Sequence, residues 1–590
     1  MSLPGLELAE ASIESQYAPP PPTQINLRAG SEWRFEIAFG ATVRVKLLTG
    51  TAEFFGTELA PLQTYTFTGT KGAIYTWHGC ALEIAAGEAV NLPNGFAPGG
   101  SSSTTAPNAG GGGGYGAGGC QSEYIAEETP MVEYSNVHFA LETMRHEAQT
   151  EGDKDGPRVL ILGPENAGKT TLTKILTGYA TKVDRQPIVV NLDPTEGMLS
   201  VPGTLTATAF RSMIDVEEGW GNSPMSGPSA IPVKLPLVYF YPMKSPLEAD
   251  GNVFKPIVSR LALSVTARMA EDDDAREAGI IVDTDGMLGQ GTPKALELIN
   301  HIVTEFSIST ILVIGSERLY STMVRTYDQK PTSSAATTHS DERITVLKLS
   351  KSGGCVDRDD AFMKAVNENQ IRSYFFGNAA TSTVSAGGAA TAASSLSSTG
   401  VAGGGGSNSN KITLSPHTQQ LDFDLLALYN YLTTSSLTDG DEDEYDPSSF
   451  NASGGGGDSS FLPGGAASAS LQSTQHASSN NTIPYDPAAA SSSSFSTSTL
   501  TTDTQALPLK KFTQPPTLAL ANTLIAITHA APNATLADIR DSSIMGFVYV
   551  ADVDAEKKKL RILAPVGGRM PGRALVWGKK WPGEVVGLVG

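Results

Sequence analysis

A short apolar run followed by a glycine-rich loop constrains the fold of this chain more than any other feature. Val159 to Leu162 are β-branched and aliphatic residues, which are typical of a buried parallel strand. They lead into Gly163-Pro-Glu-Asn-Ala-Gly-Lys-Thr170, and the spacing G-x-x-x-x-G-K-T is that of a P-loop. The glycines permit a tight turn whose backbone amides wrap phosphate. This stretch therefore predicts a strand, a phosphate-binding loop and a helix in direct succession.

The residues of this loop have distinct expected roles. Lys169 is expected to reach the β- and γ-phosphates of a nucleotide, and the Thr170 hydroxyl to bind Mg²⁺. The helix that begins at Thr171 directs unpaired N–H groups and a positive dipole end at the phosphates. The alternative is a strand-to-helix turn that binds nothing, but Lys169 and Thr170 have no evident packing role there. The sequence therefore predicts nucleotide binding.

Charge and cysteine content exclude several classes of protein. The net charge of −20 argues against a general basic surface for nucleic acid, so any RNA contact is expected to be local. The three cysteines lie far apart and share no metal-ligand spacing, which predicts neither a disulfide framework nor a zinc site. With no leader-like segment and no long apolar run, we expect an intracellular protein without a membrane span.

The length of 590 residues exceeds what one core supports, and the pattern predicts a multi-domain α/β protein. Short alternating strands over 24–96 predict an N-terminal antiparallel β-sandwich. Strands that alternate with helices over 124–377 predict a P-loop domain with a parallel sheet. The strand-like runs in 411–433 and 509–590 predict a mostly β C-terminal domain.

The remaining segments have little apolar content and are expected to be disordered, because they cannot bury enough surface to offset their ordering entropy. They are a tail over 1–23 and inserts rich in glycine, serine and alanine over 97–123, 378–410 and 434–508.

Two carboxylates end predicted strands on the side where the P-loop opens. Asp193 follows the run from Pro187 to Leu192, and Asp283 follows the run from Ala278 to Val282. Either is a candidate for the carboxylate that organises a metal ion or accepts a proton, and capping of a turn is the alternative for each. The basic residues that would close over phosphates, or else make surface ion pairs, are Arg318, Arg325, Lys351 and Arg358.

Motifs along the whole chain resemble the polyribonucleotide 5′-hydroxyl-kinase family, and in particular its subunit of the pre-mRNA cleavage and polyadenylation machinery. These motifs are Gly56-Thr-Glu-Leu59, Gly163 to Thr171, Asn191-Leu-Asp-Pro194, Glu317-Arg-Leu-Tyr320, Lys351-Ser-Gly-Gly354, Ile371-Arg-Ser-Tyr-Phe-Phe-Gly377, Ile544-Met-Gly-Phe547 and Leu560-Arg-Ile-Leu-Ala-Pro-Val566. The resemblance implies three domains, with ATP held between the first two.

The resemblance also implies a set of site residues. Glu32 and Lys71 match the residues that contact adenine, and Asp193 matches the central carboxylate, a candidate for Mg²⁺ together with Thr170. The residues that match the phosphate and Mg²⁺ site, with Gly163 opening the loop, are Asn166, Ala167, Gly168, Lys169, Thr170 and Thr171.

Two positions depart from the family members that phosphorylate RNA. Glu196 stands where those members have glutamine, and Met287 stands where they have a tryptophan that clamps the RNA base. Loss of a stacking aromatic removes about 1–3 kcal/mol of base binding. Glu196 adds negative charge where RNA phosphate would approach. Both departures act against substrate and leave the ATP site intact.

The chain resembles fungal members more closely, particularly in Asn191 to Pro194, and this implies a nuclear subunit that keeps ATP as a largely structural ligand. The implied partners are the scaffold subunit of cleavage factor IA that binds the RNA polymerase II tail and the other cleavage factor subunits, with pre-mRNA bound indirectly. The alternative is an active RNA kinase, in which Lys169 and Asp193 would be catalytic and Arg318 or Arg358 would neutralise charge. A GTPase-like switch is less favoured, since no Asn-Lys-x-Asp motif follows Gly315.

Overall fold

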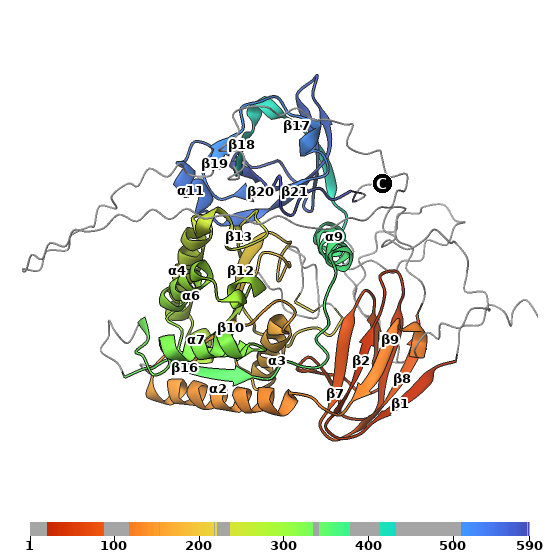
Figure 1. Cartoon of the computed structure of the whole chain (residues 1–590). Coiled ribbons are helices and arrows are strands. Elements are labelled where there is room, and N and C mark those ends of the chain that lie inside the picture. The colour runs from red at the N-terminus through yellow and green to blue at the C-terminus, as the bar shows by residue number, and fades with distance from the viewer. Residues whose placement is uncertain are drawn as a thin grey trace, which may run out of the picture. The chain divides into compact units, whose positions relative to one another are not determined.

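The computed structural model describes residues 21–87, 117–152, 154–217, 219–220, 236–333, 341–377, 414–431, 509–586 and 588 (Figure 1). All of these belong to one compact unit, Met1–Thr433 with Leu507–Gly590. The disorder expected over 378–410 and 434–508, over most of 97–123 and over 1–20 of the N-terminal tail concerns residues outside the described ranges. None of the described helices is long and apolar enough to cross a bilayer.

The N-terminal part is the predicted antiparallel β-sandwich. One sheet has the order β1-β8-β3-β6 and the other the order β5-β4-β7-β2-β9, and they enclose a core that includes Trp33 and Phe35. The last strand, β9, lies beyond the low-complexity segment and spans the expected boundary at 123/124. The strands are β1 (Thr23–Leu27), β2 (Ser31–Glu36), β3 (Val43–Gly50), β4 (Glu53–Phe54), β5 (Thr57–Glu58), β6 (Thr64–Phe67), β7 (Lys71–Thr76), β8 (Cys80–Ala86) and β9 (Ser122–Ala126).

The central part is a seven-stranded sheet of order β13-β12-β11-β14-β10-β15-β16. The five strands from β11 to β16 in this order are parallel, as predicted, whereas β12 and β13 join antiparallel at one edge, so the sheet is mixed. The strands are β10 (Arg158–Leu162), β11 (Ile188–Leu192), β12 (Thr204–Ala209), β13 (Leu237–Phe240), β14 (Ile280–Thr284), β15 (Thr310–Ile314) and β16 (Thr345–Leu349).

Helices cover both faces of this sheet, and the alternation of side chains along β10 shows why its sequence is apolar throughout. Val159 and Ile161 pack with α2 and α3, whereas Leu160 and Leu162 pack with α4 and α6. Thr292 caps α6 and Pro293 fills its first turn. The helices are α2 (Met131–Glu151), α3 (Lys169–Lys182), α4 (Phe254–Glu271), α5 (Asp273–Ala278), α6 (Pro293–Glu305), α7 (Glu317–Tyr327) and α9 (Asp360–Phe376).

The C-terminal part is built on a second seven-stranded sheet, of order β17-β22-β21-β20-β23-β18-β19, which confirms a mostly β domain. The elements are β17 (His417–Asp422), β18 (Ala427–Tyr431), β19 (Leu509–Lys511), β20 (Leu524–Thr528), α11 (Leu536–Arg540), β21 (Ile544–Asp554), β22 (Lys559–Ala564) and β23 (Ala574–Trp577). Short 3₁₀ turns lie at η1 (Ala117–Gly119), η2 (Glu248–Gly251), η3 (Gly286–Gln290), η4 (Phe423–Leu425) and η5 (Leu518–Leu520).

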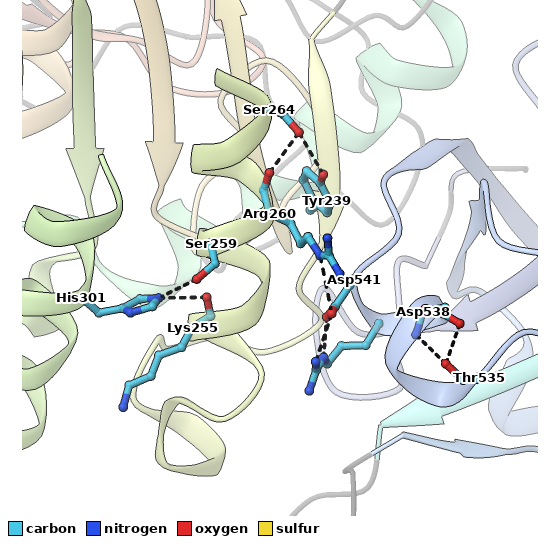
Figure 2. Close-up of polar contacts among 10 residues, drawn as sticks. Tyr239, Lys255, Ser259, Arg260, Ser264, His301, Thr535, Asp538 and Asp541 are labelled. Atoms are coloured by element: carbon cyan, nitrogen blue, oxygen red, sulfur yellow. Dashed lines mark hydrogen bonds and ion pairs between the residues drawn. The ribbon is translucent and has the colours of Figure 1, made fainter. Parts of the chain in front are cut away.

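The C-terminal sheet is joined to the central one by backbone and side-chain contacts. Tyr239 of β13 makes an isolated antiparallel bridge with Ser543. Figure 2 shows Arg260 of α4 beside Asp541, with 3.8 Å between the guanidinium Nε and the carboxylate. The Tyr374 hydroxyl of α9 accepts a hydrogen bond from the backbone N–H of Phe547 at 2.9 Å. The two parts therefore share a packed interface.

The N-terminal sandwich docks on the P-loop helix through the β4–β5 hairpin. The buried Glu53 carboxylate accepts hydrogen bonds from the Tyr179 hydroxyl of α3 at 2.5 Å and from Trp77 Nε1 at 3.3 Å. Lys182 at the end of α3 pairs with Glu58 of the hairpin at 2.8 Å. The helix that carries the P-loop is thus also the platform for the N-terminal domain.

We predict a pH-dependent stability loss for Tyr179→Phe. Burial raises the pKa of Glu53 above its ordinary value, and the Tyr179 hydrogen bond opposes this rise by stabilising the charged form. The bond therefore contributes most where Glu53 is ionised. We expect a loss of about 1.5–3 kcal/mol at about pH 8 and a smaller loss at about pH 5. Denaturant unfolding at both pH values measures it. Tyr327→Phe, which removes a 3.3 Å bond to Asn300, is the pH-independent control.

Candidate functional site

A cavity of about 700 Å³ opens in front of the P-loop, a size typical of ligand sites. Its walls come from β2 and β7 of the N-terminal sandwich, the P-loop with the start of α3, the segment around α9 and the C-terminal stretch from Lys580 to Val585. The lining includes nearly all of the residues predicted to bind nucleotide, namely Glu32, Lys71, Asn166, Ala167, Gly168, Lys169, Thr170, Thr171 and Asp193.

The P-loop has the backbone geometry that its glycines predict. Gly168 has φ of +90° at the N-cap of α3, and Asn166 also has a positive φ, 54°. A Cβ on Gly168 would lie 2.9 Å from the Cys355 sulfur, and one on Gly163 would lie 2.8 Å from the Ile314 carbonyl. Gly163 therefore packs against β15 and does not line the cavity. Gly168 is therefore required by close approach and by its left-handed conformation, and Gly163 by close approach.

The start of α3 suits an anion. No side chain of the described residues caps this helix, and its first residues, Lys169 to Thr171, line the cavity. Uncapped N–H groups at a helix start favour phosphate. The buried Lys169 ammonium donates to the Pro164 carbonyl at 2.9 Å, within its own loop. The arrangement fits the phosphates of a nucleotide.

The structure separates the two candidate carboxylates. The Thr170 hydroxyl donates to the Asp283 carboxylate at 2.6 Å. Asp193 instead accepts hydrogen bonds from the Thr195 backbone N–H at 2.8 Å and from the Thr195 hydroxyl at 2.5 Å. Asp283 therefore has the placement expected of a carboxylate that acts on a cation through Thr170, and Asp193 lies directly after the neighbouring strand, β11.

Carboxyl groups collect near the P-loop end of the cavity, where burial favours their neutral forms. Burial raises the pKa of Asp283 to about 7 and that of Asp285 to about 8. Burial also raises the pKa of Asp193, and Glu196 adds to the rise, while Lys169 opposes it. Within the described ranges, no three His, Cys, Asp or Glu side chains are grouped closely enough to hold a metal by themselves. A divalent cation would here need ligands from the nucleotide as well.

Of the four candidate basic residues, Arg358 reaches the site. Its guanidinium makes an ion pair with Glu196 and donates from Nε to the Asn166 side-chain oxygen at 3.2 Å. It thus bridges the P-loop and the loop after β11. The exposed Arg318, Arg325 and Lys351 are not among the residues that line the cavity.

The N-terminal domain forms the wall of the cavity that carries Glu32 and Lys71, the residues expected to contact adenine, and this wall is the base end of the cavity. Glu32 of β2 is 5% exposed and accepts a hydrogen bond from Arg34 Nε at 2.5 Å. Lys71 of β7 lies 3.3 Å from the Glu36 carboxylate, with its ammonium 4.9 Å from the centre of the Phe362 ring. Pattern analysis of the sequence would not find these positions, because a Glu or Lys in an alternating strand has the signature of an exposed face.

Other cavity residues carried no sequence signal at all. The Trp581 indole N–H donates to the Pro194 carbonyl at 2.8 Å, so the C-terminal domain contacts the loop after Asp193. Arg34, Cys355 and Asp285 also line the cavity. Met287, by contrast, lies next to the lining residue Gly286, and its sulfur accepts from Gln290 Nε2 at 3.0 Å.

A β-sandwich, a P-loop domain and a C-terminal β domain around one cavity define a multi-domain P-loop protein. Three family models match in succession: the N-terminal beta-sandwich domain of polyadenylation factor over 26–148, the mRNA cleavage and polyadenylation factor CLP1 P-loop over 163–377, and the pre-mRNA cleavage complex II protein Clp1 over 414–583. The chain belongs to the Clp1 family of mRNA cleavage and polyadenylation factors, of the fungal type.

Two relatives align with this chain over its full length. The mRNA cleavage and polyadenylation factor clp1 of Neosartorya fischeri is 65% identical over 590 residues, with 100% of both chains covered. That of Aspergillus oryzae is 66% identical over 594 residues, again with 100% coverage of both.

Two solved structures share the fold, each at a TM-score of 0.64 and 22% identity. One is a Clp1p–Pcf11p complex, for which the match covers 94% of this chain and 97% of that chain. The other concerns an extended Pcf11p–Clp1p interface and the basis of ATP loss in a point mutant, with 94% and 98% covered.

Proposed function

We propose that this protein is a nuclear, ATP-binding subunit of the pre-mRNA cleavage complex, needed for endonucleolytic cleavage and for polyadenylation-dependent 3′-end formation, and that its ATP is a largely structural ligand. The observation that carries this proposal is the cavity itself, whose walls come from all three domains. A ligand that contacts several domains at once, and binds only the folded form, stabilises their arrangement by mass action.

Each part of the cavity has a role in this proposal. Lys169 and the N–H groups from Asn166 to Thr171 would bind the phosphates, and Glu32 with Lys71 would contact the adenine. Thr170 would hold Mg²⁺ together with a carboxylate, either Asp283 through its contact with the threonine or Asp193. The bound Mg²⁺ and ATP supply charge that neutralises the Lys169 ammonium and the surrounding carboxylates.

The phosphate end is arranged for retention of a nucleotide more than for phosphoryl transfer. Arg358, the cation best placed to neutralise a developing charge, is already paired with Glu196. The Asp193 carboxylate is engaged by Thr195 through two hydrogen bonds. An RNA hydroxyl would have to displace these contacts, and Met287 offers no aromatic face for its base.

The solved complexes of similar proteins support a protein partner. Those structures hold Pcf11p with Clp1p. We propose that this chain likewise binds the scaffold subunit of cleavage factor IA, which in turn binds the RNA polymerase II tail, by docking on the central domain. It would meet pre-mRNA through that scaffold and the other cleavage factor subunits.

Transfer of labelled γ-phosphate from ATP to an RNA oligonucleotide with a 5′-hydroxyl tests the proposal against its alternative, an active RNA kinase. We expect no transfer by the purified wild-type chain, and intact ATP released when it is denatured. Lys169→Ala gives the blank. Transfer that depends on Lys169 would instead establish a kinase, with Asp193 accepting the proton of the hydroxyl.

A further inference from the structure

The Arg34 guanidinium joins the base end of the cavity to the P-loop domain. On its own strand it donates from Nε to Glu32. Its other nitrogens reach the Tyr124 hydroxyl at 3.2 Å, the Glu128 carbonyl at 3.3 Å and the Ser352 hydroxyl at 3.5 Å. Arg34 is 7% exposed and its hydrogen bond to Glu32 is buried, which strengthens a charge-assisted bond, whereas its contacts with Tyr124, Glu128 and Ser352 are partly buried.

The loop that Arg34 touches rests on the P-loop. A Cβ on Gly354 would lie 2.8 Å from Arg34 Nε, so this loop passes directly against the guanidinium. The next residue, Cys355, lies against Gly168. Arg34 thus fixes the Glu32 carboxylate, at the base end of the cavity, relative to the loop of Gly354 and Cys355, which packs against the P-loop.

We propose that Arg34 is a positioning residue that holds the Glu32 carboxylate as a hydrogen-bond acceptor for the exocyclic amine of adenine, and so selects adenine over guanine nucleotides. This inference rests on the proposed nucleotide binding. A charged carboxylate accepts hydrogen bonds and donates none. Adenine presents an amine donor at position 6, whereas guanine presents a carbonyl acceptor there, which a carboxylate repels.

Among the groups that interact with Glu32, Arg34 is the one whose charge keeps the Glu32 carboxylate ionised. Tyr75 on β7, Tyr134 on α2 and Cys355 in the loop all interact with Glu32, and burial raises the pKa of each, so they are neutral near pH 7. Burial also raises the pKa of Glu32, and Arg34 is the charged neighbour that opposes this rise. Without Arg34, Glu32 would take up a proton at higher pH and then could donate to the guanine carbonyl.

The test is ATP and GTP affinity of the full-length chain, by calorimetry with Mg²⁺, between about pH 5 and pH 8. For Arg34→Ala we expect the preference for ATP to fall about ten- to hundredfold, the loss of one hydrogen bond to a charged group. The midpoint at which ATP affinity declines on acidification should move to higher pH. Arg34→Lys should restore part of the preference.

Matched variants distinguish a loss of base specificity from a general loss of nucleotide affinity. Glu32→Gln keeps the shape of the side chain and should lose both the preference and its pH dependence, since an amide both accepts and donates. Arg28→Ala, which alters an exposed arginine 3.6 Å from Glu127, should leave both unchanged. A purely structural role for Arg34 would weaken ATP and GTP alike.

The outcomes distinguish this inference from the proposed function. If Arg34→Ala keeps the wild-type ratio of ATP to GTP affinity while Lys169→Ala loses nucleotide, the inference is wrong and nucleotide binding stands. If the wild-type chain binds neither nucleotide, both fail together.

Discussion

Lys169→Ala is expected to abolish ATP binding and to lower the stability of the protein and its affinity for the cleavage-factor scaffold together. The Lys169 ammonium is buried inside the P-loop, bonded to the Pro164 carbonyl, and no other lysine lies in that loop. When ATP is present at a hundred times its Kd, a ligand of this kind contributes about 3 kcal/mol to the folded state. Thermal unfolding with and without ATP, and pull-down of a Pcf11-like fragment, measure the two losses.

The two losses have a shared cause in this proposal, and a control tests that cause. Lys557→Ala removes an exposed lysine paired with Asp554 in the C-terminal domain, where a surface pair contributes less than about 1 kcal/mol. It should keep ATP and scaffold. A Lys169→Ala protein that lacks nucleotide but retains wild-type stability and scaffold affinity would contradict a structural role for ATP.

Much of the central fold follows from local sequence. The apolar run before Gly163 is a buried strand, and the spacing of the glycines produces the positive φ at Gly168 that the loop needs. The segments 253–270 and 292–305 carry helical patterns in the sequence, and they form α4 and α6 in the structure. These features are determined by periodicity and glycine placement within about a dozen residues, so the sequence contains them.

The architecture of the cavity depends on contacts that periodicity does not encode. Arg34 and Ser352 are 318 positions apart, and Trp581 is 387 positions from Pro194. Neither pair has a local signature, because each side chain would be equally suitable on a solvated surface. Similarly, β12 and β13 add antiparallel to a parallel sheet, and short strands with intermediate patterns do not indicate their pairing.

The choice between Asp193 and Asp283 shows the same limit. Both carboxylates end apolar runs in the sequence, so the sequence ranks them equally. In the structure the two strands, β11 and β14, are paired neighbours, and both carboxylates lie at the same sheet edge. The partner of Thr170 separates them, and that contact depends on how α3 lies across the sheet.

Gly56→Ala is expected to weaken both folding and nucleotide binding, although Gly56 lies outside the cavity. It occupies the turn between β4 and β5 with φ of +85°, and a Cβ there would lie 2.7 Å from the Ile175 carbonyl in α3. The α3 residue Gly178 faces the same turn, since its own Cβ would lie 2.8 Å from the Gly56 carbonyl. The hairpin and the P-loop helix thus meet backbone to backbone, and an added methyl must separate them.

Gly30→Ala isolates that separation from the cost of the backbone conformation. Gly30 has φ of +77° in the same domain, but nothing lies within 4 Å of its Cβ position. Alanine at Gly30 should cost about 1–2 kcal/mol from the left-handed conformation alone. Alanine at Gly56 should cost about 1–3 kcal/mol more from overpacking. Because the hairpin sets the sandwich on α3, only Gly56→Ala should also weaken ATP binding. Equal losses from the two variants in denaturant unfolding and calorimetry would show that the N-terminal domain does not depend on this contact to complete the nucleotide site.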